Sequence, residues 1–124
     1  MQTEKRLPDA ELAVMQAIWA YEGAVKRTQI EQILQKTHPM AATTLLTLLS
    51  RLAERGFVRI EKEGRSAVYT PLVRQEDYLA RQSRRFLDTL CGGRVDAFAA
   101  ALCNGSLTQE ELRQLRELLE RGAL

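Results

Sequence analysis

Ala41-Ala42-Thr43-Thr44-Leu45-Leu46-Thr47-Leu48-Leu49-Ser50-Arg51-Leu52 is the most informative segment of the chain. At 100° per residue, its apolar side chains gather within an arc of about 100°. They are Leu45, Leu48, Leu49 and Leu52. The opposite arc carries hydroxyl groups and one cation, from Thr43, Thr44, Thr47, Ser50 and Arg51. Leu46 lies at the border. The pattern predicts a helix that buries its leucines and turns its hydroxyl groups outward.

Two further helices are predicted before this segment. The first is expected to be capped by Asp9 and to end at Gly23. The second is expected to begin with a capping box, in which the Thr28 hydroxyl accepts from the Glu31 amide and Glu31 reaches back. His38-Pro39 should end it, because proline cannot continue a helix.

After the 41–52 segment the pattern changes to that of a hairpin. From Val58, apolar and charged residues alternate, which is typical of a strand. Glu63-Gly64 is expected to form a tight turn, and residues 66–70 to return as a second strand that Pro71 ends. Three helices followed by a β-hairpin is the order of a winged helix-turn-helix. We therefore predict a mainly α fold with a small β-hairpin, and a winged-helix domain over residues 1–74.

Residues 75–124 have the pattern of three amphipathic helices. The first should end near Gly92-Gly93, the second should cover 95–102, and the third should open with a capping box of Thr108 and Glu111. Roughly 50 residues in short helices are too few to bury a core alone, so we expect pairing with a second copy. The expected dimerisation residues are Tyr78, Leu79, Phe86, Leu87, Leu90, Phe98, Leu102, Leu112, Leu115 and Leu119.

The charge distribution weakly favours a nucleic-acid partner for the first domain. The 124-residue chain has a net charge of only +2. Residues 1–74 hold 11 Lys and Arg against 8 Asp and Glu, whereas residues 75–124 hold 7 against 8. An excess of basic charge in one segment is expected if only that segment contacts phosphates. No apolar run approaches the roughly 20 residues of a membrane span, and residues 1–6 lack the apolar core of a signal peptide. We expect a cytoplasmic protein.

Cations also gather at the expected hairpin, as Arg59, Lys62 and Arg65. We predict that Lys62 and Arg65 contact phosphate. The alternative is a solvated turn, in which neighbouring glutamates nearly cancel the charge. Plain solvation is also the alternative for the hydroxyl groups of the 41–52 helix, but such residues are poor helix formers, which favours a binding role for them. Arg51 is expected to bind phosphate, and contact with a guanine edge is the alternative.

Nothing in the sequence indicates an active site. There is no nucleophile–base motif, no Gly-rich phosphate loop and no clustered carboxylate pair, so we predict no enzymatic activity and no cofactor. Trp19 and Tyr69 are expected to pack in the core, and His38 to play no part in metal binding. Cys91 and Cys103 have no neighbouring histidines and fall short of a closed zinc site. They leave open the alternative of a thiol- or metal-responsive regulator.

Several short segments follow one another in a characteristic order along the chain. They are Leu7-Pro8-Asp9-Ala10-Glu11 with Met15 and Trp19, Thr43-Thr44 through Leu52 with Gly56, Lys62-Glu63-Gly64-Arg65, Tyr69-Thr70-Pro71-Leu72-Val73, Tyr78-Leu79, Phe86-Leu87, Gly92-Gly93 and Leu107-Thr108-Gln109-Glu110-Glu111-Leu112. This ordered set resembles the penicillinase and methicillin repressor family (BlaI, MecI and the copper repressor CopY). The resemblance implies a homodimeric repressor on a palindromic DNA operator. Its third helix would enter the major groove, its wing would touch the backbone, and its C-terminal helices would form the dimer.

The sequence departs from this family at three places. Ala41-Ala42 stands where the family usually has Ser-Pro, and Leu46 where it often has a basic residue. Derepression in the family follows cleavage by a membrane sensor protease, but the Asn-Phe bond that is cut aligns with Ala100-Ala101. The cysteine-rich tail of the copper branch is also missing. Because an exposed leucine suits a protein surface, a winged-helix protein-interaction module remains the alternative function.

Overall fold

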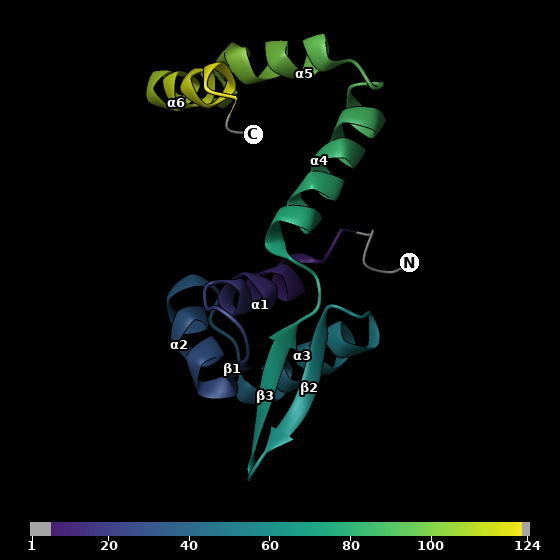
Figure 1. Ribbon diagram of the computed structural model, residues 1–124, viewed down its shortest axis with the longest axis vertical. Coiled ribbons are helices and arrows are strands. Elements are labelled where there is room, and N and C mark those ends of the chain that lie inside the picture. Colours follow the sequence, from purple (N-terminus) through teal and green to yellow (C-terminus); the bar gives the residue numbers. More distant parts are fainter. Residues whose placement is uncertain (1–5, 123–124) are drawn as a thin grey trace. The chain divides into compact units, whose positions relative to one another are not determined.

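The computed structural model describes residues 6–122, so most of the segment considered above for a signal peptide lies outside the described residues. The chain divides after Gln82 into two compact units, later than the boundary predicted after residue 74. The N-terminal unit holds α1 (Asp9–Trp19), β1 (Val25–Lys26), α2 (Arg27–Thr37), α3 (Ala42–Glu54), β2 (Val58–Glu63), β3 (Ser66–Pro71) and the start of α4 (Gln75–Leu90) (Figure 1). The C-terminal unit holds the rest of α4, α5 (Val95–Ala101), the turn η2 (Leu102–Ser106) and α6 (Gln109–Glu120).

A small antiparallel sheet with strand order β1-β3-β2 completes the N-terminal unit. β2 and β3 pair along their whole length and extend away from the helices of this unit (Figure 1). This confirms the predicted hairpin, although its turn is Gly64-Arg65 rather than Glu63-Gly64. Gly64 lies at φ 65°, a left-handed conformation that glycine adopts readily. The third strand, β1, was not predicted; its Val25 pairs with Tyr69 of β3.

The core of the N-terminal unit lies between its helices and this sheet. α1 packs against α2, α3 and β3. The four leucines of the predicted buried face of α3 are at most 7% exposed, which confirms that face. Packing roles for Trp19 and Tyr69 are also confirmed: Tyr69 is buried, and the half-buried Trp19 donates from Nε1 to the Val73 carbonyl at 2.9 Å.

The ends of α1 differ from the prediction. Pro8 precedes the helix, and Asp9 lies in its first turn, where it pairs with Arg6 at 3.3 Å instead of capping the helix. The helix ends at Trp19, so Gly23 belongs to the following turn rather than to the helix end. Pro8 occupies the N-cap position and has no side-chain acceptor, so the first amides of α1 have no side-chain cap.

The start of α2 also differs, and the capping box predicted for Thr28 and Glu31 is wrong. α2 begins at Arg27, so Thr28 already lies inside the helix. The Lys26 amide donates to Gln29 Oε1 at 2.8 Å, and Glu31 instead pairs with Arg27 at 2.9 Å. The shift follows from β1, because Lys26 is held extended beside β3 and the helix can begin only after it. The predicted end at His38-Pro39 is confirmed.

One buried ion pair links α1 to the end of α3. Glu11 is 2% exposed and is the one buried charged residue within 6–122. Arg55 Nη1 donates to Glu11 Oε2. Since Arg55 directly follows α3, this pair joins the C-terminal end of that helix to α1.

Tyr78, expected at a dimer contact, belongs instead to the core of the N-terminal unit. Its ring is 3% exposed and packs against Trp19 and Phe57, with ring centroids 5.7 and 5.9 Å away. Its hydroxyl accepts from the Leu7 amide at 2.8 Å. A side chain enclosed by its own chain cannot contact a second copy, so Tyr78 leaves the dimerisation set. The physical reason is that the first turns of α4 are part of this core.

Tyr78→Phe is expected to lower the free energy of unfolding by about 1–2 kcal/mol, because the buried Leu7 amide loses its acceptor while the ring packing stays. Urea denaturation measures the change. Tyr21→Phe is the matched control, since the hydroxyl of the half-buried Tyr21 makes a longer hydrogen bond, 3.3 Å to the Gln29 carbonyl. Equal losses for the two variants would contradict the role given to Tyr78.

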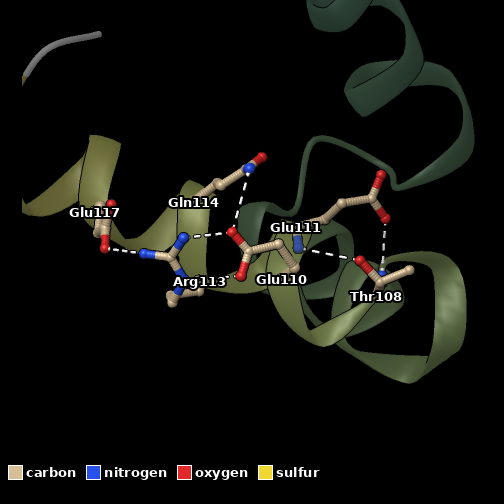
Figure 2. Close-up of polar contacts among 6 residues, drawn as sticks. All are labelled: Thr108, Glu110, Glu111, Arg113, Gln114 and Glu117. Carbon is tan, nitrogen blue, oxygen red and sulfur yellow. Dashed lines mark hydrogen bonds and ion pairs between the residues drawn. The ribbon is translucent and has the colours of Figure 1, made fainter.

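The C-terminal unit has no fully buried residue within its described part, 83–122. Phe86 and Phe98 pack edge to face at 5.7 Å. The predicted capping box of α6 is confirmed: Thr108 N–H donates to Glu111 Oε1 at 2.8 Å, and Glu111 N–H donates to Thr108 Oγ1 at 3.1 Å (Figure 2). This unit is therefore well-formed helix by helix but lacks a core of its own.

Ion pairs connect the charged side chains on the polar side of α6. Figure 2 shows Arg113 between Glu110 and Glu117, with 3.0 Å from Arg113 Nε to Glu110 Oε2. The hydrogen bond from Arg113 lowers the pKa of Glu110 and raises the pKa of Arg113. At 100° per residue these charges lie on the arc opposite Leu115 and Leu119. α6 thus has one charged side and one apolar side.

Candidate nucleic-acid interface

The outward face of α3 carries all five side chains predicted for it. Thr43, Thr44, Thr47, Ser50 and Arg51 are exposed. They face solvent because the opposite leucines are held in the core. From Thr43 to Arg51 this face extends about 12 Å along the helix axis. Hydroxyl groups and one guanidinium over this length can hydrogen-bond to base edges and phosphates.

Thr47 is oriented by a bond within the helix. Its hydroxyl donates to the Thr43 carbonyl at 3.0 Å. In this arrangement the Thr47 oxygen can still accept a hydrogen bond. The exocyclic amino groups of adenine and cytosine are the donors that a major groove offers to such an acceptor.

The start of α3 differs from a side-chain-capped helix. Ala41 occupies the N-cap position and has no side chain that can accept a hydrogen bond. The first-turn amides of α3 therefore have no capping side chain, as the Ala41-Ala42 pair implies. Such amides favour an anion at the helix start.

Lys62 and Arg65 are both exposed at the end of the hairpin, and Arg65 is part of its turn. Within residues 6–122 neither has a carboxylate at ion-pair distance, whereas Arg59 pairs with Glu61 at 3.1 Å. Of these three wing cations, Arg59 is therefore the one held in an ion pair with a neighbouring glutamate within the described residues. Lys62 and Arg65 are available to bind phosphate.

A hollow of about 340 Å³ joins α2, α3 and the hairpin. Its lining comes from Lys26, Arg27, Thr28, Leu46, Arg65, Ser66, Ala67 and Tyr69. Lys26 and Arg27 were not among the residues predicted to contact DNA. Lys26 and Arg27 come close to Arg65 because β1 pairs with β3, and this pairing was not predicted from the sequence. The structure thus adds two cations beside the wing.

No group of three or more potential metal ligands (His, Cys, Asp or Glu) occurs within the described range 6–122. Cys91 is half-buried and Cys103 exposed, and both are free thiols in the C-terminal unit. His38 closes the end of α2. Over the same residues, no helix combines the length and apolar character needed to cross a bilayer.

Several known proteins that this chain resembles belong to one group of repressors. The family model for penicillinase repressors matches residues 7–121. The penicillinase repressor of Bacillus licheniformis is 34% identical over 120 residues, covering 94% of this chain and 93% of that protein. The methicillin resistance regulatory protein MecI of Staphylococcus aureus strain N315 is 28% identical over 116 residues, covering 93% of this chain and 94% of that protein.

A solved structure matches the N-terminal part. It is the solution structure of monomeric Bacillus licheniformis BlaI in complex with the blaP half-operator, which is 36% identical with a TM-score of 0.50. The match covers 60% of this chain and 89% of that one. The sequence similarity thus extends over nearly the whole chain. The structural similarity covers the N-terminal part and is to a protein solved in complex with DNA.

Proposed function

This chain belongs to the penicillinase repressor family and is a DNA-binding transcriptional repressor, and we propose that it acts as a homodimer on a palindromic operator. The observation that carries the proposal is α3, whose leucines are buried while its hydroxyl groups and Arg51 face solvent. The wing adds the exposed Lys62 and Arg65, which have no carboxylate at ion-pair distance within residues 6–122. Members of the family are transcriptional repressors and not enzymes. We propose that the chain acts in the cytoplasm, where its DNA lies, and catalyses no reaction.

In this proposal α3 enters the major groove, and the wing contacts the backbone. Thr43, Thr44, Thr47 and Ser50 contact base edges, and Arg51, Lys62 and Arg65 bind phosphates. Support comes from their exposure and from the matched structure, which is a complex with a half-operator. The protein-interaction alternative rests on Leu46, which is exposed.

The dimer proposal is supported by the C-terminal unit. Its described residues include none that is fully buried, which leaves its apolar side chains for a second copy to cover. Phe86, Leu90 and Leu119 of this unit are each at least 45% exposed, as is Leu79, which precedes the unit in α4. Half-buried side chains complete the proposed contact, namely Leu87, Phe98, Leu102, Leu112 and Leu115.

The inducing signal is a separate proposal. Family membership makes a membrane sensor protease a candidate partner, but Ala100-Ala101 in place of the family's cleavage bond argues for cleavage elsewhere or for another signal. A thiol-responsive repressor is the second candidate, favoured by exposed Cys103 and half-buried Cys91. The thiol-responsive proposal would be wrong if oxidant and metal left repression unchanged both in the parent protein and in a Cys91→Ser, Cys103→Ser double variant.

The experiment that tests the proposed function is an anisotropy titration of DNA from upstream of the protein's own gene against salt. We expect sequence-dependent binding whose affinity falls steeply between roughly 50 and 200 mM salt, because phosphate contacts release counterions. A random duplex of equal length is the control. Equal affinity for both duplexes, or no salt dependence, would contradict DNA recognition by this chain.

Arg51→Ala and Lys62→Ala should each weaken operator binding about tenfold, because a dimer loses two phosphate contacts. The slope of log affinity against log salt should fall by about 2 in each case. Arg59→Ala is the matched control, since Glu61 already pairs with Arg59 and its loss should change affinity less than about twofold. If Arg59→Ala weakened binding as much as Lys62→Ala, the assignment of the wing contacts would be wrong.

A further inference from the structure

Leu46 is an exposed apolar residue on the otherwise polar outward side of α3. It is 40% exposed, although the other four leucines of the helix are buried. It lies three residues after Thr43 and four before Ser50, so these three side chains are neighbours along one side of the helix. Because the core is already filled from the opposite face, folding does not require a leucine here.

The surroundings of Leu46 are cationic. The hollow that it lines also carries Lys26, Arg27 and Arg65, with hydroxyl groups from Thr28 and Ser66. Arg27 is partly neutralised by Glu31, but within residues 6–122 Lys26 and Arg65 have no carboxylate at ion-pair distance. An apolar side chain among cations fits a polyanion that offers one apolar group. The major groove of DNA meets this description, because phosphates line it and the C5-methyl of thymine is its apolar base substituent.

We propose that Leu46 contacts the C5-methyl group of a thymine in each half of the operator, while the cations around the hollow bind the phosphates beside it. This inference rests on the proposed function and adds a specificity-determining residue to it. Contact between the leucine methyl groups and the thymine methyl removes both from water. Burying one methyl-sized group changes affinity about fourfold, so two half-sites should give roughly 15-fold.

The test replaces thymine by deoxyuridine, which removes only the methyl group. The probe is the upstream duplex protected by the wild-type protein in footprinting, with one symmetric pair of thymines replaced at a time. Wild-type protein should lose roughly 15-fold in affinity at one pair of positions. Leu46→Ala should lose a similar factor on the thymine duplex and show no further loss when that pair is replaced.

Leu72→Ala is the matched control, because Leu72 is 50% exposed but lies after the hairpin and does not line the hollow. It should bind like the wild type on every duplex. Thermal unfolding of Leu46→Ala should match the wild type, since the side chain is not part of the core.

Two results would overturn the inference while leaving the proposed function intact. One is operator binding by Leu46→Ala equal to the wild type, which would return the residue to the protein-interaction alternative. The other is the same loss at every deoxyuridine position in both proteins. A wild-type protein that binds no upstream DNA in a sequence-dependent way would overturn the proposed function as well.

Discussion

Replacement of Leu90 and Leu119 by glutamate should convert the protein to a monomer that binds a palindromic operator about 100-fold more weakly but a single half-site unchanged. Both leucines are among the most exposed apolar side chains of the chain, at 71% and 59%. Buried carboxylates without partners are strongly unfavourable, so two pairs of them should prevent association.

The size of the loss follows from linkage of two binding sites. In a dimer, binding of the first half-site raises the local concentration of the second, which strengthens overall binding by about 10²–10⁴ without any new contact. Light scattering after gel filtration measures the monomer, and anisotropy with full and half-site duplexes measures the two affinities.

Leu72→Glu is the control, since it adds a carboxylate at an exposed leucine of the N-terminal unit. It should remain dimeric. A double variant that stays dimeric, or a monomer that keeps its full affinity for the palindrome, would show that the C-terminal helices do not form the functional contact.

Arg55→Ala is expected to lower the free energy of unfolding by about 2–3 kcal/mol. The change leaves the Glu11 carboxylate enclosed without its cation, and an unpaired buried charge costs several kcal/mol. We expect less than the cost for a wholly buried pair, because the Arg55 side chain is 33% exposed and water can partly replace it. Urea denaturation measures the loss.

Two further variants separate the buried pair from ordinary surface charge. Arg74→Ala removes one partner of the exposed pair with Glu76 and should lower the free energy of unfolding far less than Arg55→Ala does. Glu11→Leu combined with Arg55→Leu should recover most of the stability, because apolar residues of similar size tolerate the same burial. A loss for Arg55→Ala no greater than for Arg74→Ala would show that the pair is not structurally important.

The parts of the fold that the sequence predicted are those fixed by local periodicity. The α3 leucines recur at helical spacing and are buried as expected, and the hairpin follows from alternation around a glycine. The same spacing of 100° per residue correctly predicted that the five polar side chains of α3 face outward. This prediction required no knowledge of the rest of the chain.

What could not be predicted depends on residues distant in sequence. β1 is two residues long, too short for alternation to be visible, and it shifts the start of α2 away from Thr28. Tyr78 falls on the apolar stripe of α4, so only the contacts with Leu7 and Trp19 reveal that it faces its own core. The hollow around Leu46 likewise requires three separate segments to meet.

The position of Tyr78 has a consequence for how repression can be lifted. Because the first turns of α4 complete the N-terminal core, a chain severed beyond Gln82 keeps every aromatic partner of that core. In the proposed dimer, scission within the C-terminal unit would remove the dimer contact without unfolding the N-terminal unit. The remaining N-terminal unit would then bind only one half-site of the proposed operator, and it would lose the gain in affinity that linkage of two half-sites provides.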